Sequence, residues 1–174
     1  MQALQGVGFT VNGAQRELRT NADGVAYLRR LPTRQSVNLA VDPTTLEDPQ
    51  WSLALEGVQL VPRAGTAAEL DFPVIMTGEV DGVVYVVTED KRRPAAGMTL
   101  QLLAMDPAFK LVRETKTASD GFFIVEAVPP GDYLLRVAPE DVKRSKLSDT
   151  GTRVITVSPK GDLINGVDLF LTRR

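Results

Sequence analysis

Apolar and polar residues alternate with a period of two along most of this sequence. Three clear runs contain these apolar positions: Val7, Phe9 and Val11; Val37, Leu39 and Val41; Leu70, Phe72, Val74 and Met76. Alternation puts every second side chain on one face of an extended chain, so these runs predict strands with one buried face. No long window has apolar residues at helical spacing, and we therefore expect an all-β fold.

The predicted strands are short and are separated by residues that favour turns. The clearest turn signals are Asn12-Gly13, Asp23-Gly24, Asp120-Gly121 and Pro130-Gly131. Glycine adopts positive φ at little cost, and the aspartate before it can cap a turn through its carboxylate, so the Asp-Gly steps predict hairpin turns. Residues 139–146 are the one segment predicted to form a short helix.

The sequence also contains an internal repeat, in which three blocks recur in the same order about 97 residues later. The matching residues are Thr20, Asp23 and Gly24 with Thr117, Asp120 and Gly121; Leu39, Val41 and Pro43 with Leu135, Val137 and Pro139; and Leu70, Phe72 and Val74 with Val167, Leu169 and Leu171. Recurrence of ordered blocks at nearly the same displacement is typical of duplicated domains.

The repeat divides the chain into two predicted domains, residues 1–76 and residues 77–174. In the second copy, residues 78–96 precede the strand predicted at residues 98–105, whereas very little precedes the equivalent strand at residues 5–12. We therefore expect the first domain to lack its opening strand, and we expect that strand to lie at an edge of the sandwich. That strand would lie upstream in a longer parent chain or be supplied by a neighbour, because an unpaired sheet edge exposes backbone N–H and C=O groups.

Two motifs follow each other in the second copy. They are Thr117, Asp120, Gly121 and Phe123, and then Pro129, Gly131, Tyr133, Leu135 and Val137. They resemble the T-x-x-D-G-x-F/Y turn and the L/V-P-x-G-x-Y-x-L-x-V strand of the carboxypeptidase-regulatory-like family, also called transthyretin-like or prealbumin-like β-sandwiches. The resemblance covers the second copy and most of the first, which departs from the pattern at residues 32–35. It implies two tandem transthyretin-like or Ig-like antiparallel β-sandwich domains.

The resemblance also implies a role, because modules of this family look like spacers and interaction domains in bacterial surface, fimbrial and usher-type outer-membrane proteins. A further block, residues 41–49 with Gly57 and residues 61–65, is similar to the C-terminal extension of fimbrial usher-like proteins. The resemblance therefore implies an extracytoplasmic location, in the periplasm, in the outer membrane or at the cell surface.

The composition excludes several kinds of catalytic and binding site. The chain has no cysteine and no histidine, so thiolate catalysis, disulfides and the commonest general base and metal ligand are excluded. A net charge of -2 gives no strong field for nucleic acid or anionic lipid. No apolar run is long enough to span a bilayer, and residues 1–13 do not have the pattern of a signal peptide.

Several residues have a structural and a functional interpretation. Asp23 and Asp120 are predicted turn residues first; the alternative, calcium binding, needs six to eight oxygens, and each turn offers one carboxylate. Tyr133 is expected to be a core residue whose hydroxyl bonds a nearby carbonyl. Trp51, the only tryptophan, is expected to cover one end of the first sandwich, with sugar stacking or an interface role as the alternative.

Charged residues give no convincing site. The carboxylates considered as an acid/base pair are Glu47, Asp48, Glu69 and Asp71. They fall on predicted loops and strand surfaces without surrounding aromatic subsites, so we expect no catalytic, cofactor or metal-binding residue. The run Lys91-Arg92-Arg93, considered with Arg173-Arg174, lies beside Glu89 and Asp90 and is predicted to be a solvated hairpin tip.

We therefore expect non-catalytic structural and protein-interaction modules of a bacterial cell-envelope or fimbrial-assembly protein, with partners bound by β-strand addition. Two alternatives remain. One is a carbohydrate-binding module that uses Trp51 or the loop around Tyr85, and the other is an accessory domain of an enzyme beyond this stretch of sequence. No cofactor and no nucleic-acid partner are expected.

Overall fold

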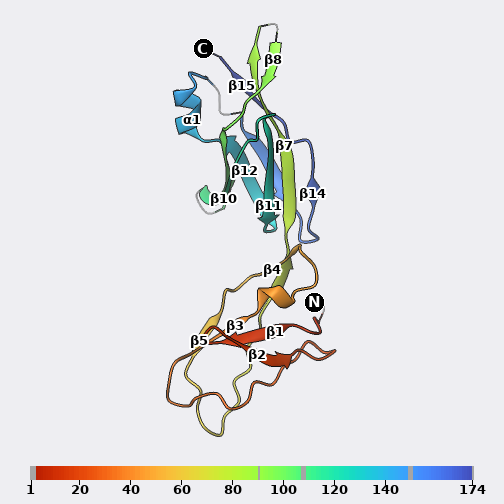
Figure 1. Ribbon diagram of the computed structural model, residues 1–174, viewed down its shortest axis with the longest axis vertical. Helices are drawn as coiled ribbons and strands as arrows, with labels where there is room; N and C mark the ends of the chain where they lie inside the picture. The colour runs from red at the N-terminus through yellow and green to blue at the C-terminus, as the bar shows by residue number, and fades with distance from the viewer. Residues whose placement is uncertain (1–2, 90, 107–108, 149–150, 174) are drawn as a thin grey trace. The chain divides into compact units, whose positions relative to one another are not determined.

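A computed structural model describes residues 3–89, 91–106, 109–148 and 151–173. The chain divides into two compact units, Met1–Ile75 and Met76–Arg174, here called the N-terminal and C-terminal units (Figure 1). Both consist almost entirely of strands. The predicted all-β sandwich fold is therefore confirmed.

The N-terminal unit contains a four-stranded antiparallel sheet and a small two-stranded one. The larger sheet has the order β2 (Ala14–Arg19), β1 (Gly8–Val11), β3 (Val37–Val41), β5 (Val58–Leu60). The smaller sheet pairs β4 (Trp51–Leu53) with β6 (Val74–Met76), and a short 3-10 helix covers Pro43–Thr45. The core residues are the predicted alternating ones of β1 and β3: Val7, Phe9, Val11, Val37, Leu39 and Val41.

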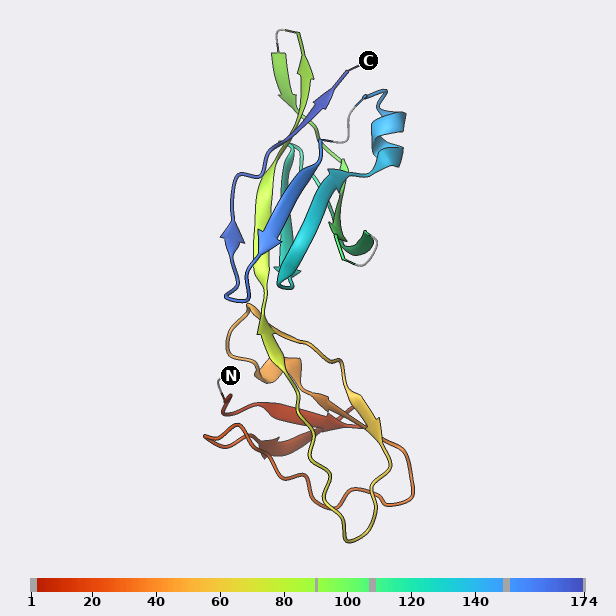
Figure 2. The ribbon, with the colours of Figure 1, turned by 180° about the vertical axis from the view of Figure 1, so that it is seen from behind.

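The C-terminal unit has two full layers, visible from both sides in Figures 1 and 2. The first sheet has the order β10 (Lys110–Lys116), β9 (Thr99–Ala104), β12 (Gly131–Val137), β13 (Arg153–Val157). In the second sheet β7 (Gly78–Thr88) pairs with β11 (Phe122–Val128), β14 (Leu163–Ile164), β15 (Leu169–Thr172) and β8 (Lys91–Pro94). Helix α1 spans Pro139–Arg144, inside the segment predicted to be helical.

The core of the C-terminal unit lies between its two sheets. Its largest fully buried side chains include Leu100, Leu102 and Leu135 from one sheet and Phe123, Leu169 and Leu171 from the other. Burial of each such side chain contributes about 1.5 to 3 kcal/mol. The hydrophobic effect thus holds the two sheets of this unit together.

The pairing of β7 departs from the expected antiparallel arrangement. Most pairs are antiparallel, but β14 and β15 both run parallel to β7. β7 is also a central strand, with β11 on one side and β14 and β15 on the other, so the expectation that the opening strand lies at an edge is wrong. Alternation cannot separate these cases, because it reports which face of a strand is buried and not its neighbours.

One predicted strand of the N-terminal unit is shorter than expected, and the equivalent of β11 is not a strand. Residues 25–31, the equivalent of β11, have no strand assignment, and only Val74–Met76 of the run from Leu70 to Met76 is a strand. Ala26, Leu28 and Leu31 nevertheless pack against the core. Packing against the core does not by itself make this segment a strand, because a ladder also needs a strand partner.

The Asp-Gly turns were expected to be hairpins, and this is wrong. In the C-terminal unit the turn at Gly121 connects β10 of one sheet to β11 of the other. Gly121 and its equivalent Gly24 have φ of 77° and 72°, so the predicted need for positive φ is confirmed. These turns carry the chain across the sandwich.

A buried threonine next to each turn makes the same hydrogen bonds in both units. Val7 N–H donates to Thr20 Oγ1 at 2.9 Å, and this hydroxyl donates to Leu4 C=O at 2.6 Å. In the C-terminal unit the equivalents are Met98 N–H to Thr117 Oγ1 at 2.9 Å and Thr117 Oγ1 to Ala95 C=O at 2.6 Å. We call these the threonine corners. With the identical strand orders, they show that the sequence repeat is also a repeat of structure.

Within the described ranges, no helix has the length and apolar character needed to cross a membrane.

Candidate functional site

The clearest difference between the two copies lies at residues 25–31 of the N-terminal unit. In the C-terminal unit the equivalent strand β11 is hydrogen-bonded to β7. Among the described residues, by contrast, the backbone groups of residues 26–31 have no hydrogen-bond partner. Both backbone groups of Val25 bond to Asn21: its C=O accepts Asn21 N–H at 2.9 Å and its N–H donates to Asn21 Oδ1 at 2.9 Å. The stretch 26–31, in which Arg30 has a φ of 59°, therefore has unpaired backbone N–H and C=O groups.

A second unpaired stretch is formed by residues 70–72. Its repeat equivalent runs from Val167 to Leu169, which leads into β15 beside β7. The backbone groups of residues 70–72 likewise bond to no described residue, and the next bond along the chain is Ala54 N–H to Pro73 C=O at 3.0 Å. These two stretches correspond to the two neighbours of β7. We call these two stretches together, residues 25–31 and 70–72, the open strand position.

Burial differs in the same place. Phe123, Val125 and Val128 of β11 are 1%, 3% and 0% exposed, whereas the N-terminal equivalents are only half-buried. Those equivalents are Ala26, Leu28 and Leu31. Likewise Leu169 and Leu171 are 0% exposed, whereas their equivalents Phe72 and Val74 are half-buried. The second layer of the N-terminal core is thus partly open.

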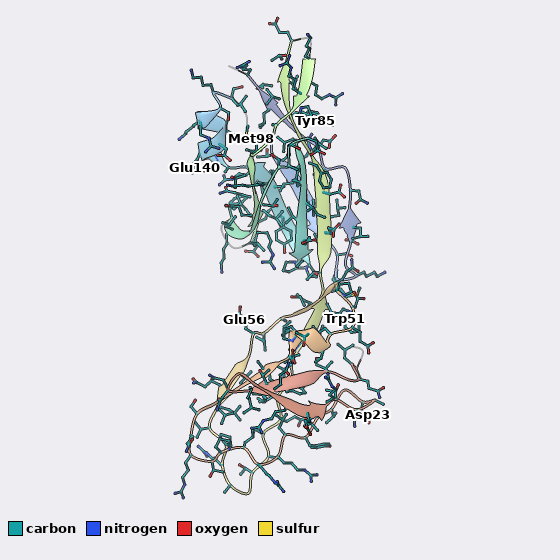
Figure 3. The ribbon with its side chains drawn as sticks, in the orientation of Figure 1. Asp23, Trp51, Glu56, Tyr85, Met98 and Glu140 are labelled. Atoms are coloured by element: carbon teal, nitrogen blue, oxygen red, sulfur yellow. The ribbon has the colours of Figure 1, made fainter. Side chains whose placement is uncertain are left out.

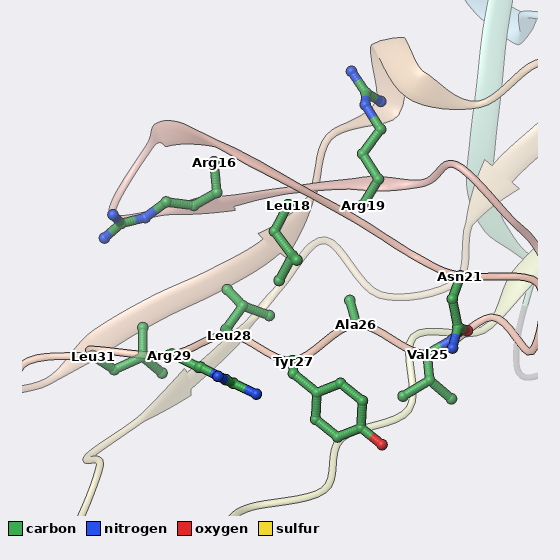
Figure 4. Close-up of a pocket in the computed structure, with 10 residues that line it drawn as sticks. All are labelled: Arg16, Leu18, Arg19, Asn21, Val25, Ala26, Tyr27, Leu28, Arg29 and Leu31. Carbon is green, nitrogen blue, oxygen red and sulfur yellow. The ribbon is translucent and has the colours of Figure 1, made fainter.

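A shallow groove of about 450 Å³ runs beside residues 25–31 (Figure 4). Leu18 of β2 and Leu28 point toward each other across it, whereas the ring of Tyr27 points away. Tyr27 is 70% exposed and Val25 is 42% exposed. Apolar side chains and unpaired backbone thus occur together, as they do where a polypeptide strand is bound.

The same groove is basic. Arg16, Arg19 and Arg29 line this groove between β2 and residues 25–31, and no carboxylate does. The side chain of Arg19 points away from residues 25–31 in Figure 4, and its guanidinium donates to Gly6 C=O at 3.0 Å. In the C-terminal unit Arg113, the equivalent of Arg16, donates to Ala127 C=O at 3.0 Å and so bridges β10 to β11. Arg16 makes no such bond to any described residue. The groove therefore favours a ligand that carries negative charge.

The predicted turn aspartates have different roles. Asp120 Oδ1 accepts Phe122 N–H at 3.1 Å, so capping by this carboxylate is confirmed. In the first turn Asn21 Oδ1 accepts the N–H groups of Asp23 and Val25, and the prediction that Asp23 caps the turn is wrong. A side chain two residues before the aspartate has taken over the same function. In the described ranges no three acidic residues gather as a metal site would require.

Tyr133 has the predicted core role. Its ring is 4% exposed, and its hydroxyl donates to Pro129 C=O at 2.7 Å. Burial raises the pKa of this hydroxyl. The bond fixes the approach of the chain to β12, as the sequence predicted.

Trp51 lies in β4 and is half-buried (Figure 3). β4 pairs with β6, and in the C-terminal unit Leu147 pairs with Arg173 at the equivalent place. Leu147 is 6% exposed and belongs to the core. This equivalence favours the interpretation of Trp51 as a residue that covers one end of the sandwich.

The carboxylates considered for catalysis do not form a cluster of acidic groups. Glu47, Glu69 and Asp71 are exposed, and Asp48 accepts Gln50 N–H at 2.8 Å within its own loop. The carboxylates thus lie on the surface positions that the sequence predicted.

The basic run lies in β8, which pairs with the end of β7, and its three residues are exposed, as predicted for a hairpin tip. The guanidinium of Arg92 lies 5.2 Å from the ring of Tyr85, which stacks on Phe170 at 5.7 Å. Asp90 and Arg174 lie outside the described residues.

Sequence reasoning missed two buried carboxylates. Asp141 Oδ2 accepts Thr99 N–H at 2.7 Å, and this bond holds the pKa of Asp141 below its ordinary value. Asp42 accepts the Thr44 hydroxyl at 2.7 Å, which lowers the pKa of Asp42. Both flank the proline that follows a core strand, and this placement was the available signal. Asp42 bonds Gln15 of β2 and Thr44 of the 3-10 helix, and Asp141 of α1 bonds Thr99 of β9, so each carboxylate joins a strand to a short helix.

Comparison with known families gives one match. The family model described as "BOS complex subunit NOMO1-like, second beta sandwich domain" matches residues 78–157, from β7 through β13. The C-terminal unit is therefore similar in sequence to a known β-sandwich domain. No curated protein matches the chain.

Several solved structures are distantly similar. The minor pilin GBS52 of Streptococcus agalactiae is 14% identical, with a TM-score of 0.46 over 99% of this chain and 85% of that chain. The TIE protein of Bacillus anthracis is 17% identical, with a TM-score of 0.44 over 99% and 31% of the two chains. A putative carbohydrate binding protein of Pseudomonas aeruginosa is 17% identical, with a TM-score of 0.39 over 57% and 90%. At these values no function transfers to this chain.

Proposed function

We propose that this chain forms non-catalytic structural and protein-interaction modules of a bacterial cell-envelope protein. The observation that supports this is the open strand position, where unpaired backbone groups of residues 26–31 lie beside exposed Val25 and Tyr27. A sheet edge recognises another polypeptide through main-chain hydrogen bonds, and neighbouring side chains add specificity. Few other ligands satisfy a row of alternating donors and acceptors.

The proposal includes two domains, residues 1–76 and 77–174, with the first lacking the counterpart of β7. The matching strand orders and threonine corners support this division. Membership of the carboxypeptidase-regulatory-like family, an extracytoplasmic location and a role in fimbrial assembly remain parts of the proposal that depend on the sequence motifs. In this setting the C-terminal unit would act as a rigid spacer.

Photo-crosslinking from the open strand position tests the proposal. A photoreactive phenylalanine analogue replaces Tyr27, which is 70% exposed, in the parent protein in its own cells. Val154, which is 65% exposed in the C-terminal unit, takes the same analogue as the matched control. We expect a protein adduct in the envelope fraction from position 27 and little from position 154. The proposal fails if position 27 yields no adduct or if the two positions yield the same adducts in equal amounts.

The carbohydrate alternative predicts a different result, in the fluorescence of Trp51. Half-burial of Trp51 and the stacking of Tyr85 on Phe170 leave both rings engaged within the protein. We therefore expect no shift of tryptophan emission when a panel of cell-wall and plant polysaccharides is titrated into the chain. A saturable shift that is lost in Trp51→Leu, with the fold retained, would favour a carbohydrate-binding module instead.

A further inference from the structure

We propose that the open strand position binds an extended acidic-apolar polypeptide strand with the chemistry of β7. The inference deepens the function proposed above and rests on it, because it identifies what kind of partner the interaction module takes. The internal repeat supplies the template: the C-terminal unit shows the same site with its strand in place. Three features of that template define the occupant, namely its hydrogen-bond register, its inward side chains and its outward charges.

The register follows from β7. It pairs antiparallel with β11, with Phe123 opposite Gly82 and Val125 opposite Val80, and parallel with β15, with Leu169 opposite Val84. Shifting β11 and β15 back by 97 residues places the occupant antiparallel to residues 25–31. It also places the occupant parallel to the chain that begins at Leu70. The backbone groups that it would pair with are those left without partners in the N-terminal unit.

The inward side chains follow from burial. Val80 and Val84 of β7 are both 0% exposed between the sheets. Between them Gly82 approaches the neighbouring chain so closely that an added Cβ would lie 2.3 Å from Val167 O, and Leu70 is the N-terminal equivalent of Val167. The occupant therefore needs branched apolar residues at two inward positions and glycine midway between them. Its apolar residues would cover the half-buried Leu28.

The charges beside the site indicate which residues the bound strand would carry on its outward face. β7 carries Glu79 and Asp81 on that face, and Asp81 lies opposite Ile124, the equivalent of Tyr27. Arg29, two residues from Tyr27 on the same face, is exposed. Carboxylates at the positions of Glu79 and Asp81 would lie near Arg29 as cross-strand or diagonal neighbours. A strand with acidic outward residues thus fits this site better than a basic one.

The first experiment adds the strand as a separate peptide. A synthetic peptide with the sequence of Gly78–Thr88 is mixed with the full chain, and hydrogen exchange is measured by segment. We expect exchange in residues 26–31 and 70–72 to slow by about tenfold or more, with no change in β12. A control peptide carries Val80→Asp and Val84→Asp, which break the apolar face and leave the length unchanged. It is expected to give no protection.

The second experiment adds the strand within the chain. A copy of residues 78–94 is joined directly to Leu4, which reproduces the spacing to Ala95, the equivalent of Leu4. Trp51 fluorescence then reports unfolding of the N-terminal unit, because it is the only tryptophan. We expect the midpoint of thermal unfolding to rise by about 10 °C. The same graft with aspartate at both inward valine positions should leave the midpoint unchanged.

Three results would overturn the inference. One is unchanged exchange and an unchanged midpoint with both additions; another is equal protection by the aspartate controls. The third is protection of residues 26–31 that grows with protein concentration and without added peptide, which would make a second copy the occupant. Envelope protein adducts from position 27, found together with no effect of the added peptide or the grafted copy, would refute this inference alone. Protection without envelope adducts would refute the proposed function alone.

Discussion

Replacing Phe123 with alanine is expected to lower the free energy of unfolding of the C-terminal unit by about 3 to 5 kcal/mol. Phe123 is 1% exposed and lies between the two sheets, so its removal leaves a cavity that surrounding strands cannot fill. Slow exchange of the buried amides of β12, followed in urea, measures this loss. A decrease below about 1 kcal/mol would contradict a closed core at this position.

The matched control for this prediction uses one equivalent pair of residues. Val125→Ala should cost about 2 kcal/mol, because Val125 is 3% exposed. Leu28→Ala, at the equivalent half-buried position of the N-terminal unit, should cost about 1 kcal/mol or less, although it removes more atoms. The larger truncation is thus expected to have the smaller effect. The opposite order would show that the N-terminal core is as closed as the C-terminal one.

Replacing Thr117 with valine is expected to destabilise the C-terminal unit by about 2 to 4 kcal/mol. Valine has nearly the same shape, but it leaves Met98 N–H and Ala95 C=O buried without their partner. Thr117→Ser keeps the hydroxyl and should recover most of the loss. Urea unfolding of the three proteins gives the comparison.

The N-terminal threonine corner offers an independent check. Thr20→Val removes the same two bonds, to Val7 N–H and Leu4 C=O, and Trp51 emission reports the unfolding of that unit. A loss of similar size in each unit would support their descent from one repeated structure. A neutral Thr117→Val with a costly Thr117→Ser would contradict the assigned role of the hydroxyl.

Local sequence signals predicted much of the fold. Alternation identified the inward residues of β1 and β3, and the repeat predicted equivalences that the hydrogen bonds of Thr20 and Thr117 reproduce. Tyr133 was also assigned correctly, because a buried phenol needs a nearby acceptor and the preceding turn supplies one. These features depend on contacts within one strand or one turn.

Features that depend on distant partners were not predictable in the same way. The parallel pairing of β14 and β15 with β7 depends on how the chain returns to the sheet, and alternation does not encode that return. Capping by Asn21 in place of Asp23 is a choice between two short polar side chains in one turn. Residues 25–31 form no strand although β11 does, and the difference between them is that β11 is hydrogen-bonded to β7.

The candidate site was therefore only half predicted. The unequal start of the two copies led us to expect an absent opening strand at an edge of the first domain, whereas β7, the opening strand of the C-terminal unit, is central. The basic character of the groove, from Arg16, Arg19 and Arg29, was not predicted either. Arg16 and Arg19 lie in β2 and Arg29 in the following segment, and the turn between them places all three along one groove.

Hydrogen exchange of the full chain, with nothing added, tests the central claim most directly. The account predicts that the amides of residues 26–31 exchange within about tenfold of the rate of an unstructured peptide. In the same sample the β11 amides that pair with β7 should be protected about a thousandfold or more. Comparable protection of the two equivalent segments would contradict the open strand position, and with it the binding function built on it.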